Sequence, residues 1–360
     1  MKLKKNISQL FMAWALLMCS LLACGHVKAS AASDPGNGPS IYSAALDNPA
    51  YPSDTVDAQL RKLSAQAWFM IDAETGRILS SKNPDQRMYP ASMTKMMTCI
   101  LACESGRLNE TVTISKAAAS VPYGNVSKGE KYRLHDLLYR VMLPSDNGAA
   151  HAVGEFLAND SLSFAKMMNE KAQQLGMRHT HFVNAHGLPD DDHYSTARDM
   201  MKLVKYCMRN KIFAEIVSNP TRDITTLGGK AIHLKNTNKL FDRYDGCLGI
   251  KTGTTRAAGG CLASAVMRNG MKIYLVIMKC EPARVRTDES IVLYNKGFEM
   301  MAEFSKMRQQ RKKGGNKSSN GYFNSGSGTR DERNVPRPKN HDLHHDELLK
   351  QQQDVPARRH

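Results

Sequence analysis

The chain has 360 residues, of which 50 are lysine or arginine and 34 are aspartate or glutamate, giving a formal net charge of +16 at pH 7. A chain of this length can build a hydrophobic core without disulfide bonds. It contains no glycine-rich phosphate loop and no Cys and His set with zinc spacing, which excludes the commonest nucleotide-binding and structural zinc proteins. We therefore expect no metal, no cofactor and no nucleic-acid partner.

Residues 1–31 have the features of a secretory signal peptide. Three lysines in residues 1–5 precede an apolar run at residues 11–23 that is too short to span a bilayer comfortably. Two processing sites are possible. Leu21 to Cys24 resembles the lipobox of a bacterial lipoprotein, and Ala29-Ser30-Ala31 resembles an ordinary signal-peptidase cleavage site. Cys24 can also be simply one more apolar residue of the signal. We expect an exported protein that works outside the cytoplasmic membrane, in the periplasm or at the cell-wall face, with lipid anchoring at Cys24 as one alternative.

Residues 57–304 have the length of one ordinary domain, between a flexible leader at residues 32–56 and a basic tail at residues 305–360. Strand patterns lie near both ends of this domain and helical apolar spacing fills its middle. This order predicts an α+β fold, with one antiparallel sheet covered by helices and an inserted helical region. The predicted strands are Ala67 to Ile71, Arg77 to Leu79, Cys247 to Ile250, Cys261 to Met267 and Lys272 to Met278. The predicted helices are Ser92 to Glu104, Leu134 to Met142, Asp146 to Leu157, Phe164 to Leu175, Ala197 to Met208 and Thr287 to Phe304.

Six of the eight cysteines lie outside the signal region, each in an apolar or regular segment. In an exported protein these six could pair, but we favour buried free thiols because a domain of this size does not need disulfides. Cys99 and Cys103 are four residues apart on one predicted helix, yet no partner set with zinc spacing accompanies them. The other four are Cys207, Cys247, Cys261 and Cys280.

The tail carries 13 lysine and arginine residues against 6 aspartate and glutamate residues between positions 306 and 360, with clusters of Gly, Ser and Gln. This composition predicts disorder. Outside the membrane a basic tail is attracted to anionic lipids or wall polymers, and the alternative is that it only contributes to solubility.

Ser92 and Lys95 bring a hydroxyl and an amine together one helical turn apart, at the start of a predicted helix. A serine hydroxyl is a weak nucleophile that needs a neighbouring base, and a lysine can serve if burial or nearby cations lower its pKa. The S-x-x-K pattern is common in ordinary helices, so its meaning depends on the motifs that follow it.

Two further motifs follow in order. Ser145-Asp146-Asn147 opens a predicted helix, and Lys251-Thr252-Gly253 follows the strand predicted from Cys247. With Ser92 and Lys95 they form the S-x-x-K, S-D-N and K-T-G set typical of penicillin-recognising serine enzymes. Each motif alone has an ordinary explanation as a helix N-cap or a strand end, but three motifs in this order favour catalysis.

From Ala65 to Phe304 the sequence resembles the low-molecular-mass penicillin-binding proteins, which are the D-alanyl-D-alanine carboxypeptidases of serine peptidase family S11. The resemblance implies a fold like that of the β-lactamases and transpeptidases. Besides the three motifs, the resemblance rests on Phe182-Val183-Asn184, His193 to Met200 and Asn236-Thr237-Asn238. Two departures are visible. Asp146 stands where this family more often has glycine and where the related β-lactamases have aspartate, and the small β-rich domain that commonly follows the catalytic domain is missing.

The resemblance implies a serine-type carboxypeptidase that removes the terminal D-alanine from a peptidoglycan pentapeptide ending in D-Ala-D-Ala. Ser92 would attack the peptide carbonyl and become an acyl-enzyme, with Lys95 as its base and Ser145 relaying the proton to the leaving amine. β-Lactam antibiotics would acylate the same serine as covalent inhibitors. The residues expected to bind the substrate are Asn147 through its amide, Thr254 through its backbone N–H in the oxyanion hole with that of Ser92, and Lys251 and Thr252 at the terminal carboxylate.

Arg286 is the candidate for a second cation at that carboxylate, because it lies just before the last predicted helix, where the family places a carboxylate-binding arginine. Arg284 is the alternative if the register differs by a turn. The ordinary explanation is a surface arginine paired with Asp288 or Glu289.

Two other functions remain open. A serine β-lactamase needs a glutamate-activated water to release the penicilloyl group, and no Glu followed closely by Leu-Asn occurs after Asn147. A catalytically inactive wall-binding module would not need the intact motif residues, whose presence argues against it.

Overall fold

The computed structural model describes residues 60–315, with side chains through Met307. The expected signal peptide, the leader up to residue 56 and the tail beyond Gly315 lie outside the described residues.

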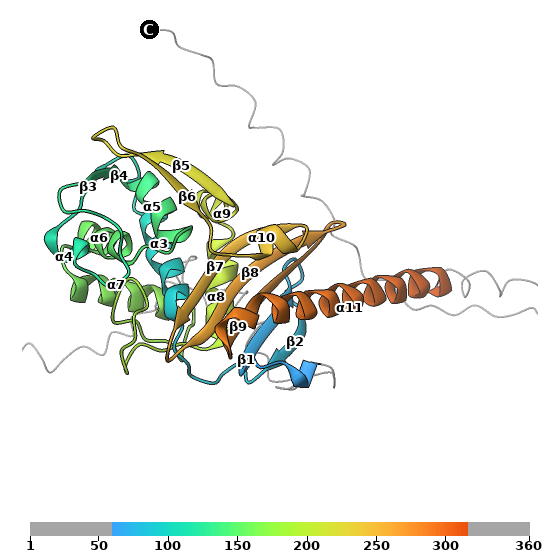
Figure 1. The fold of residues 1–360 in the computed structure, drawn as a ribbon. Helices are drawn as coiled ribbons and strands as arrows, with labels where there is room; N and C mark the ends of the chain where they lie inside the picture. Colours follow the sequence, from blue (N-terminus) through green and yellow to red (C-terminus); the bar gives the residue numbers. More distant parts are fainter. Residues whose placement is uncertain (1–59, 316–360) are drawn as a thin grey trace, which may run out of the picture. The chain divides into compact units, whose positions relative to one another are not determined.

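Five antiparallel strands form the central sheet, in the order β2-β1-β9-β8-β7. The N-terminal hairpin therefore pairs with the C-terminal strands through β1 and β9, where Phe69 lies opposite Val276. Strand β7, which carries the third motif, is an edge strand (Figure 1). The strands are β1 (Ala67–Asp72), β2 (Ile78–Lys82), β7 (Cys247–Thr255), β8 (Gly259–Arg268) and β9 (Met271–Cys280).

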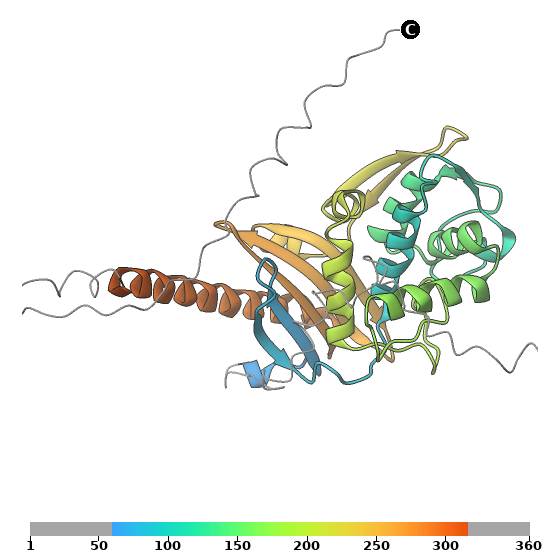
Figure 2. The same cartoon turned by 180° about the vertical axis from the view of Figure 1, so that it is seen from behind.

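Helices cover both faces of this sheet. Side chains alternate along a strand, so Trp68 of β1 packs into one core and its neighbour Phe69 packs into the other. Helix α11 (Arg286–Gly315) lies along the Trp68 face, where its Tyr294 is fully buried. Helix α8 (Ala197–Cys207) packs against β1 and β9 on the opposite face, as the two views in Figures 1 and 2 show.

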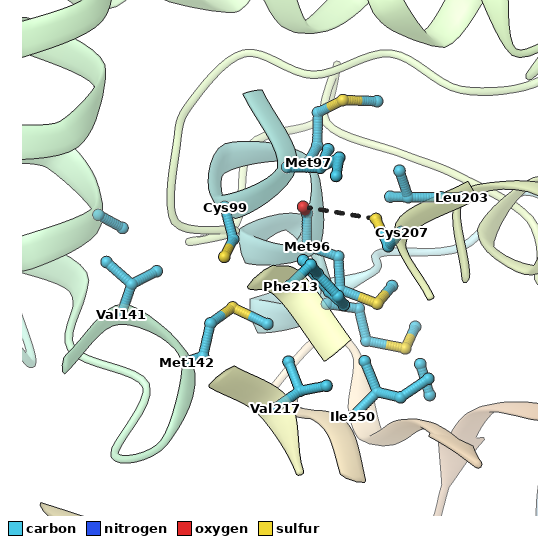
Figure 3. Packing of buried hydrophobic residues seen from close by; sticks show 14 of the residues in the cluster. Met96, Met97, Cys99, Val141, Met142, Leu203, Cys207, Phe213, Val217 and Ile250 are labelled. Carbon is cyan, nitrogen blue, oxygen red and sulfur yellow. Dashed lines mark hydrogen bonds between the residues drawn. The ribbon is translucent and has the colours of Figure 1, made fainter. Parts of the chain in front are cut away.

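Helix α3 (Lys95–Glu104) is the centre of the helical region, because every residue of it except Glu104 is buried. It packs against α5, α6, α8 and α9. Figure 3 shows Met96, Met97 and Cys99 of α3 among side chains from α5, α8, α9 and β7. The hydrophobic core thereby fixes the helix that carries Lys95. The surrounding helices are α5 (Leu134–Met142), α6 (Asn147–Ala158), α7 (Ser161–Gln174) and α9 (Lys211–Val217).

The α+β architecture expected from the sequence is confirmed, and three boundaries differ in ways that matter. Ala91–Thr94 form a 3₁₀ turn, η2, so the α-helix starts at Lys95 and not at Ser92. Strand β7 continues through the third motif to Thr255 instead of ending at Ile250. Helix α11 continues past Phe304 to Gly315, so residues 305–315 are helical and do not belong to a disordered tail.

The sequence patterns also missed several short elements. The strands of the two small hairpins, β3–β4 and β5–β6, each bury a single side chain, so their hydrophobic patterns are too weak to detect. The missed elements are η1 (Leu60–Lys62), β3 (Thr111–Thr113), α4 (Lys116–Ala119), β4 (Lys131–Arg133), α9 (Lys211–Val217), β5 (Thr221–Thr225), β6 (Ala231–Lys235), α10 (Leu240–Arg243) and η3 (Ala283–Val285).

The six cysteines of the described region are free thiols, as expected, and all except the half-buried Cys247 are buried. Cys99 and Cys103 on α3 have their sulfur atoms 4.0 Å apart. Within residues 60–315, none of the helices combines the length and the apolar character that a membrane span requires.

Candidate active site

Ser92 lies in the η2 turn immediately before α3. The preceding residue, Ala91, has a φ of 48°, an unfavourable left-handed conformation for a residue with a side chain. Gly187 packs directly on this turn: it has a φ of 85°, and a Cβ at this position would stand 1.9 Å from the carbonyl oxygen of Ala91. Only glycine allows this approach, which braces the turn that presents Ser92.

Lys95 is completely buried, and its amine makes three hydrogen bonds. It donates to the hydroxyl of Ser92 at 2.9 Å, to Oδ1 of Asn147 at 2.6 Å and to the backbone carbonyl of His186 at 2.7 Å. Burial lowers the pKa of Lys95 well below its ordinary value, and the positive charge of Lys251 lowers it further. The surroundings thus make the amine easier to deprotonate, and an amine that has lost a proton can accept one from Ser92.

The three residues of the second motif have different positions. One lines the cleft, one is bonded to the surrounding fold, and one does both. Ser145 lines the cleft, with a φ of 67°. Asp146 points into the scaffold: its carboxylate accepts hydrogen bonds from the backbone N–H of Ala149 at 3.0 Å, as the N-cap of α6, and from Nε of Arg140 at 2.9 Å. Asn147 reaches Lys95 through Oδ1 and donates from Nδ2 to the carbonyl of Pro122 at 2.7 Å.

Strand β7 brings the third motif against Ser92. Gly253 lies beside Ser92, since a Cβ placed there would stand 3.0 Å from the backbone nitrogen of Ser92. Lys251 is buried and donates to the carbonyl of Thr252 at 3.1 Å. Burial, with a smaller effect of the Arg286 charge, lowers the pKa of Lys251 to about 7.

Arg286 connects the start of α11 to the end of the motif strand. Its guanidinium donates to the carbonyl of Gly253 at 3.1 Å and to the hydroxyl of Thr254. Burial lowers the pKa of Arg286. Arg284 is instead exposed in η3, so the geometry favours Arg286 of the two register alternatives.

These groups surround a cavity of about 590 Å³. Six of the eight sequence-predicted site residues line it, and the remaining two, Lys95 and Lys251, are buried behind the wall in contact with lining residues. The six are Ser92, Ser145, Asn147, Thr252, Thr254 and Arg286. Among residues 60–307, no three His, Cys, Asp or Glu side chains are grouped so that they could hold a metal ion.

Comparison with known proteins decides the family. The family model for peptidase S11, D-alanyl-D-alanine carboxypeptidase, matches residues 53–281, more than half of the chain. The chain belongs to this family. Among curated members, DacF of Bacillus subtilis (strain 168) is 31% identical over 229 residues, which cover 62% of this chain and 59% of that protein. DacA of Haemophilus influenzae is 33% identical over 253 residues, covering 66% of this chain and 62% of that protein.

A solved structure supports the same fold for this member of the S11 family. The crystal structure of the Streptomyces K15 DD-transpeptidase superposes with a TM-score of 0.63 at 29% identity, covering 66% of this chain and 98% of that one. The transpeptidase-like α+β fold predicted from the sequence is therefore confirmed.

The cavity is also lined by residues that were not named as site residues from the sequence, among them Thr237 and Tyr123. Thr237 lines the cavity, and its hydroxyl lies 2.6 Å from that of Thr252 and 3.3 Å from the carbonyl of Leu143. Thr237 belongs to Asn236-Thr237-Asn238, one of the stretches on which the family resemblance is based. The sequence of that stretch did not indicate a contact with the third motif. Tyr123 belongs to a loop with no recognised motif, so no sequence signal could have revealed it.

Proposed function

We propose that this protein is a serine-type D-alanyl-D-alanine carboxypeptidase, which removes the terminal D-alanine from peptidoglycan stem peptides through an acyl-enzyme and is acylated by β-lactams at the same serine. The observation that carries the proposal is the buried amine of Lys95, 2.9 Å from the hydroxyl of Ser92. An amine whose pKa is lowered by burial can act as the general base that a serine nucleophile requires.

In the proposed acylation, neutral Lys95 takes the proton of Ser92 while the serine oxygen attacks the carbonyl carbon between the two D-alanines. The backbone N–H groups of Ser92 and Thr254 stabilise the negative charge that develops on the carbonyl oxygen. Collapse of the tetrahedral intermediate breaks the C–N bond, and the proton passes from Lys95 through the hydroxyl of Ser145 to the leaving amine of D-alanine. Water, activated by the same lysine, then attacks the ester and regenerates Ser92.

The terminal carboxylate of the substrate is proposed to bind between Lys251, Thr252 and Arg286. Two cations at one end of the cleft suit a carboxylate, and an arginine can hold it with two parallel hydrogen bonds. The hydroxyl of Thr252 can donate to the carboxylate when the hydroxyl of Thr237, 2.6 Å away, donates to Thr252 instead of to the carbonyl of Leu143.

A β-lactamase is less well supported. Among the described residues that line the cavity there is no aspartate or glutamate to activate a deacylating water. Asp146, the residue type shared with β-lactamases, has its carboxylate bound to Arg140 and to the N-terminus of α6. An inactive wall-binding module is disfavoured by the hydrogen bonds that join Lys95 to Ser92 and Asn147.

The protein is further proposed to act outside the cytoplasmic membrane, on the basis of the signal-like residues 1–31. Mass spectrometry of the mature N-terminus distinguishes the two possible processing sites. A diacylglyceryl group on Cys24 would support lipid anchoring, and a free N-terminus at Ala32 would exclude it. Contact of the basic tail with an anionic membrane or wall polymer remains a proposal based on composition alone.

The proposed activity is tested by release of D-alanine from an N-acetylated peptide ending in D-Ala-D-Ala. Wild-type protein should release one D-alanine per peptide, and Ser92→Ala should release none, because no other hydroxyl occupies that position. Equal release by both proteins would refute the assignment. Rapid turnover of penicillin together with no peptide hydrolysis would favour the β-lactamase.

A further inference from the structure

Tyr123 is a cavity residue that the proposed mechanism does not use. Its side chain is 86% exposed and lines the cavity together with Ser92 and Asn147. Among the described residues it is the most exposed large hydrophobic side chain. An aromatic ring has a large apolar surface to bury, so an exposed ring beside a cleft is well suited to contact a ligand.

The backbone at Tyr123 is strained in the same way as the backbone on either side of the proposed chemistry. Its φ is 59°, a rare conformation for a bulky residue. Ala91, next to the nucleophile, and Ser145 of the second motif also have positive φ. Such strain persists only where the surrounding structure enforces it, and it concentrates at functional sites.

The second motif enforces the conformation of the Tyr123 loop. Nδ2 of Asn147 donates to the carbonyl of Pro122 at 2.7 Å, and the carboxylate of Asp146 accepts from the backbone N–H of Asn125 at 3.1 Å. The residues immediately before and after Tyr123-Gly124 are therefore tied to the motif. Asp146, which stands here in place of the more usual glycine, thus supplies one of the two hydrogen bonds that anchor the loop.

Close backbone packing adds to these anchors. Gly124 lies on the first turn of α6, where a Cβ would stand 2.8 Å from the backbone nitrogen of Gly148. The guanidinium of Arg140, which pairs with Asp146, also donates to the carbonyl of Asn125. The backbone that carries the ring is consequently fixed before any ligand binds, which reduces the entropy lost on binding.

The position of Tyr123 indicates which part of a peptide it would contact. The cations Lys251 and Arg286 belong to β7 and α11 and suit the terminal carboxylate. Tyr123 belongs to a different element of the lining, a loop attached to α6, and the cavity lining also includes the apolar Leu188 and Pro189. An apolar surface of this kind suits an aliphatic chain and not a carboxylate.

We propose that Tyr123 is a specificity-determining residue, whose ring packs on the aliphatic part of the residue preceding D-Ala-D-Ala in the substrate. This inference rests on the proposed carboxypeptidase function. It deepens that function by assigning a binding surface to the acyl side of the scissile bond, separate from the groups that perform the chemistry.

The test compares two substrates in the full-length protein: N-acetyl-D-Ala-D-Ala, and the same dipeptide extended by one lysine with both amines acetylated. The kcat/KM for D-alanine release is measured for wild type, Tyr123→Phe and Tyr123→Ala. We expect Tyr123→Ala to lose about tenfold more on the extended peptide than on the short one, and Tyr123→Phe to keep most of the wild-type preference. Leu162→Ala is the matched control, because Leu162 is an equally exposed apolar residue, 83% exposed, on α7 away from the cavity.

Equal losses on the two peptides in Tyr123→Ala would overturn the inference, since they would show a general effect on the site. Wild-type kcat/KM on both peptides in Tyr123→Ala would overturn it as well. These two results leave the carboxypeptidase proposal standing, because wild type still releases D-alanine. A wild-type protein that hydrolyses neither peptide would instead refute the proposed function, and the inference with it.

Discussion

The amine of Lys95 lies 2.9 Å from the hydroxyl oxygen of Ser92, in a pocket where the lysine has no exposed surface. The same amine donates to Oδ1 of Asn147, so a residue of α6 also holds the amine in place. A lysine held this way has one orientation and a pKa lowered by burial and by the charge of Lys251. These are the properties of a general base poised beside its nucleophile.

Lys95→Met should remove the base while filling most of its volume. We expect D-alanine release to fall by about 10²–10⁴-fold, the usual contribution of a positioned acid–base group. The measurement is kcat on a D-Ala-D-Ala peptide, with thermal unfolding to verify that the variant is folded. Turnover within tenfold of wild type in a folded variant would mean that Lys95 is not the base.

The value of kcat/KM should fall at alkaline pH for a substrate that ends in a carboxylate, but not for one that ends in an amide. The pKa of Lys251 is lowered to about 7, so its positive charge is present below that pH and is lost as the pH rises through it. A substrate with a terminal carboxylate should therefore lose kcat/KM above about pH 7 in the free protein. The same peptide with a C-terminal amide, although poor, should not show this fall. Identical profiles for the two peptides would show that Lys251 does not bind the carboxylate.

Arg286→Ala should slow hydrolysis of a D-Ala-D-Ala peptide by about 30- to 150-fold, equivalent to about 2–3 kcal/mol, the value of a hydrogen bond between charged groups. Its amide-capped analogue should lose much less, because it presents no charge to the guanidinium. Arg284→Ala, an exposed arginine two residues away, serves as the matched control and should behave like wild type. If Arg286→Ala weakened both peptides equally, its contacts with Gly253 and Thr254 would be structural only.

Acid should destabilise the fold partly through His193. Its Nδ1 accepts from the N–H of Val183 at 3.2 Å, so its Nε2 donates to the hydroxyl of Thr94 at 2.8 Å, and the neutral ring has both nitrogens paired. Burial lowers the pKa of His193 to about 4. The folded state therefore binds fewer protons than the unfolded state, and stability that is present above about pH 6.5 is lost as the pH falls toward 4.

The full loss from this group is about 3 kcal/mol, since one pKa unit corresponds to about 1.4 kcal/mol. Urea unfolding between pH 4 and pH 7.5 measures it. His193→Gln should have a lower free energy of unfolding at neutral pH and a flatter pH dependence than wild type. His186, whose pKa burial lowers to about 3, should leave some slope in the variant. Parallel curves for the two proteins would exclude His193 as a source of the acid sensitivity.

The sequence predicted the main strands and helices because each has a strong hydrophobic period. Helix α5 matched its predicted bounds, Leu134–Met142, since its apolar spacing is regular and it ends just before Pro144. The hairpin strands, such as β3 at Thr111–Thr113, were missed because each buries one side chain. The end of α11 was placed too early, at Phe304, because the later residues have no apolar face to predict a helix from.

The motif residues of the site could be named in advance because each motif is short, ordered and chemically distinct. What could not be predicted depends on contacts between distant segments. The carbonyl of His186 reaches Lys95 across 91 positions, and Thr237 reaches Thr252 only because β6 leads back to the motif strand. The structural use of Asp146 likewise required Arg140 and Asn125 to be brought together in space.

Mass spectrometry of the intact protein after brief exposure to benzylpenicillin tests the central claim, that Ser92 is the nucleophile, most directly. The wild-type mass should increase by one penicilloyl group, and peptide mapping should assign that group to Ser92. Ser92→Ala should remain unmodified while unfolding at a temperature close to that of wild type. A penicilloyl group on any other residue, or an equal mass increase in Ser92→Ala, would contradict the account.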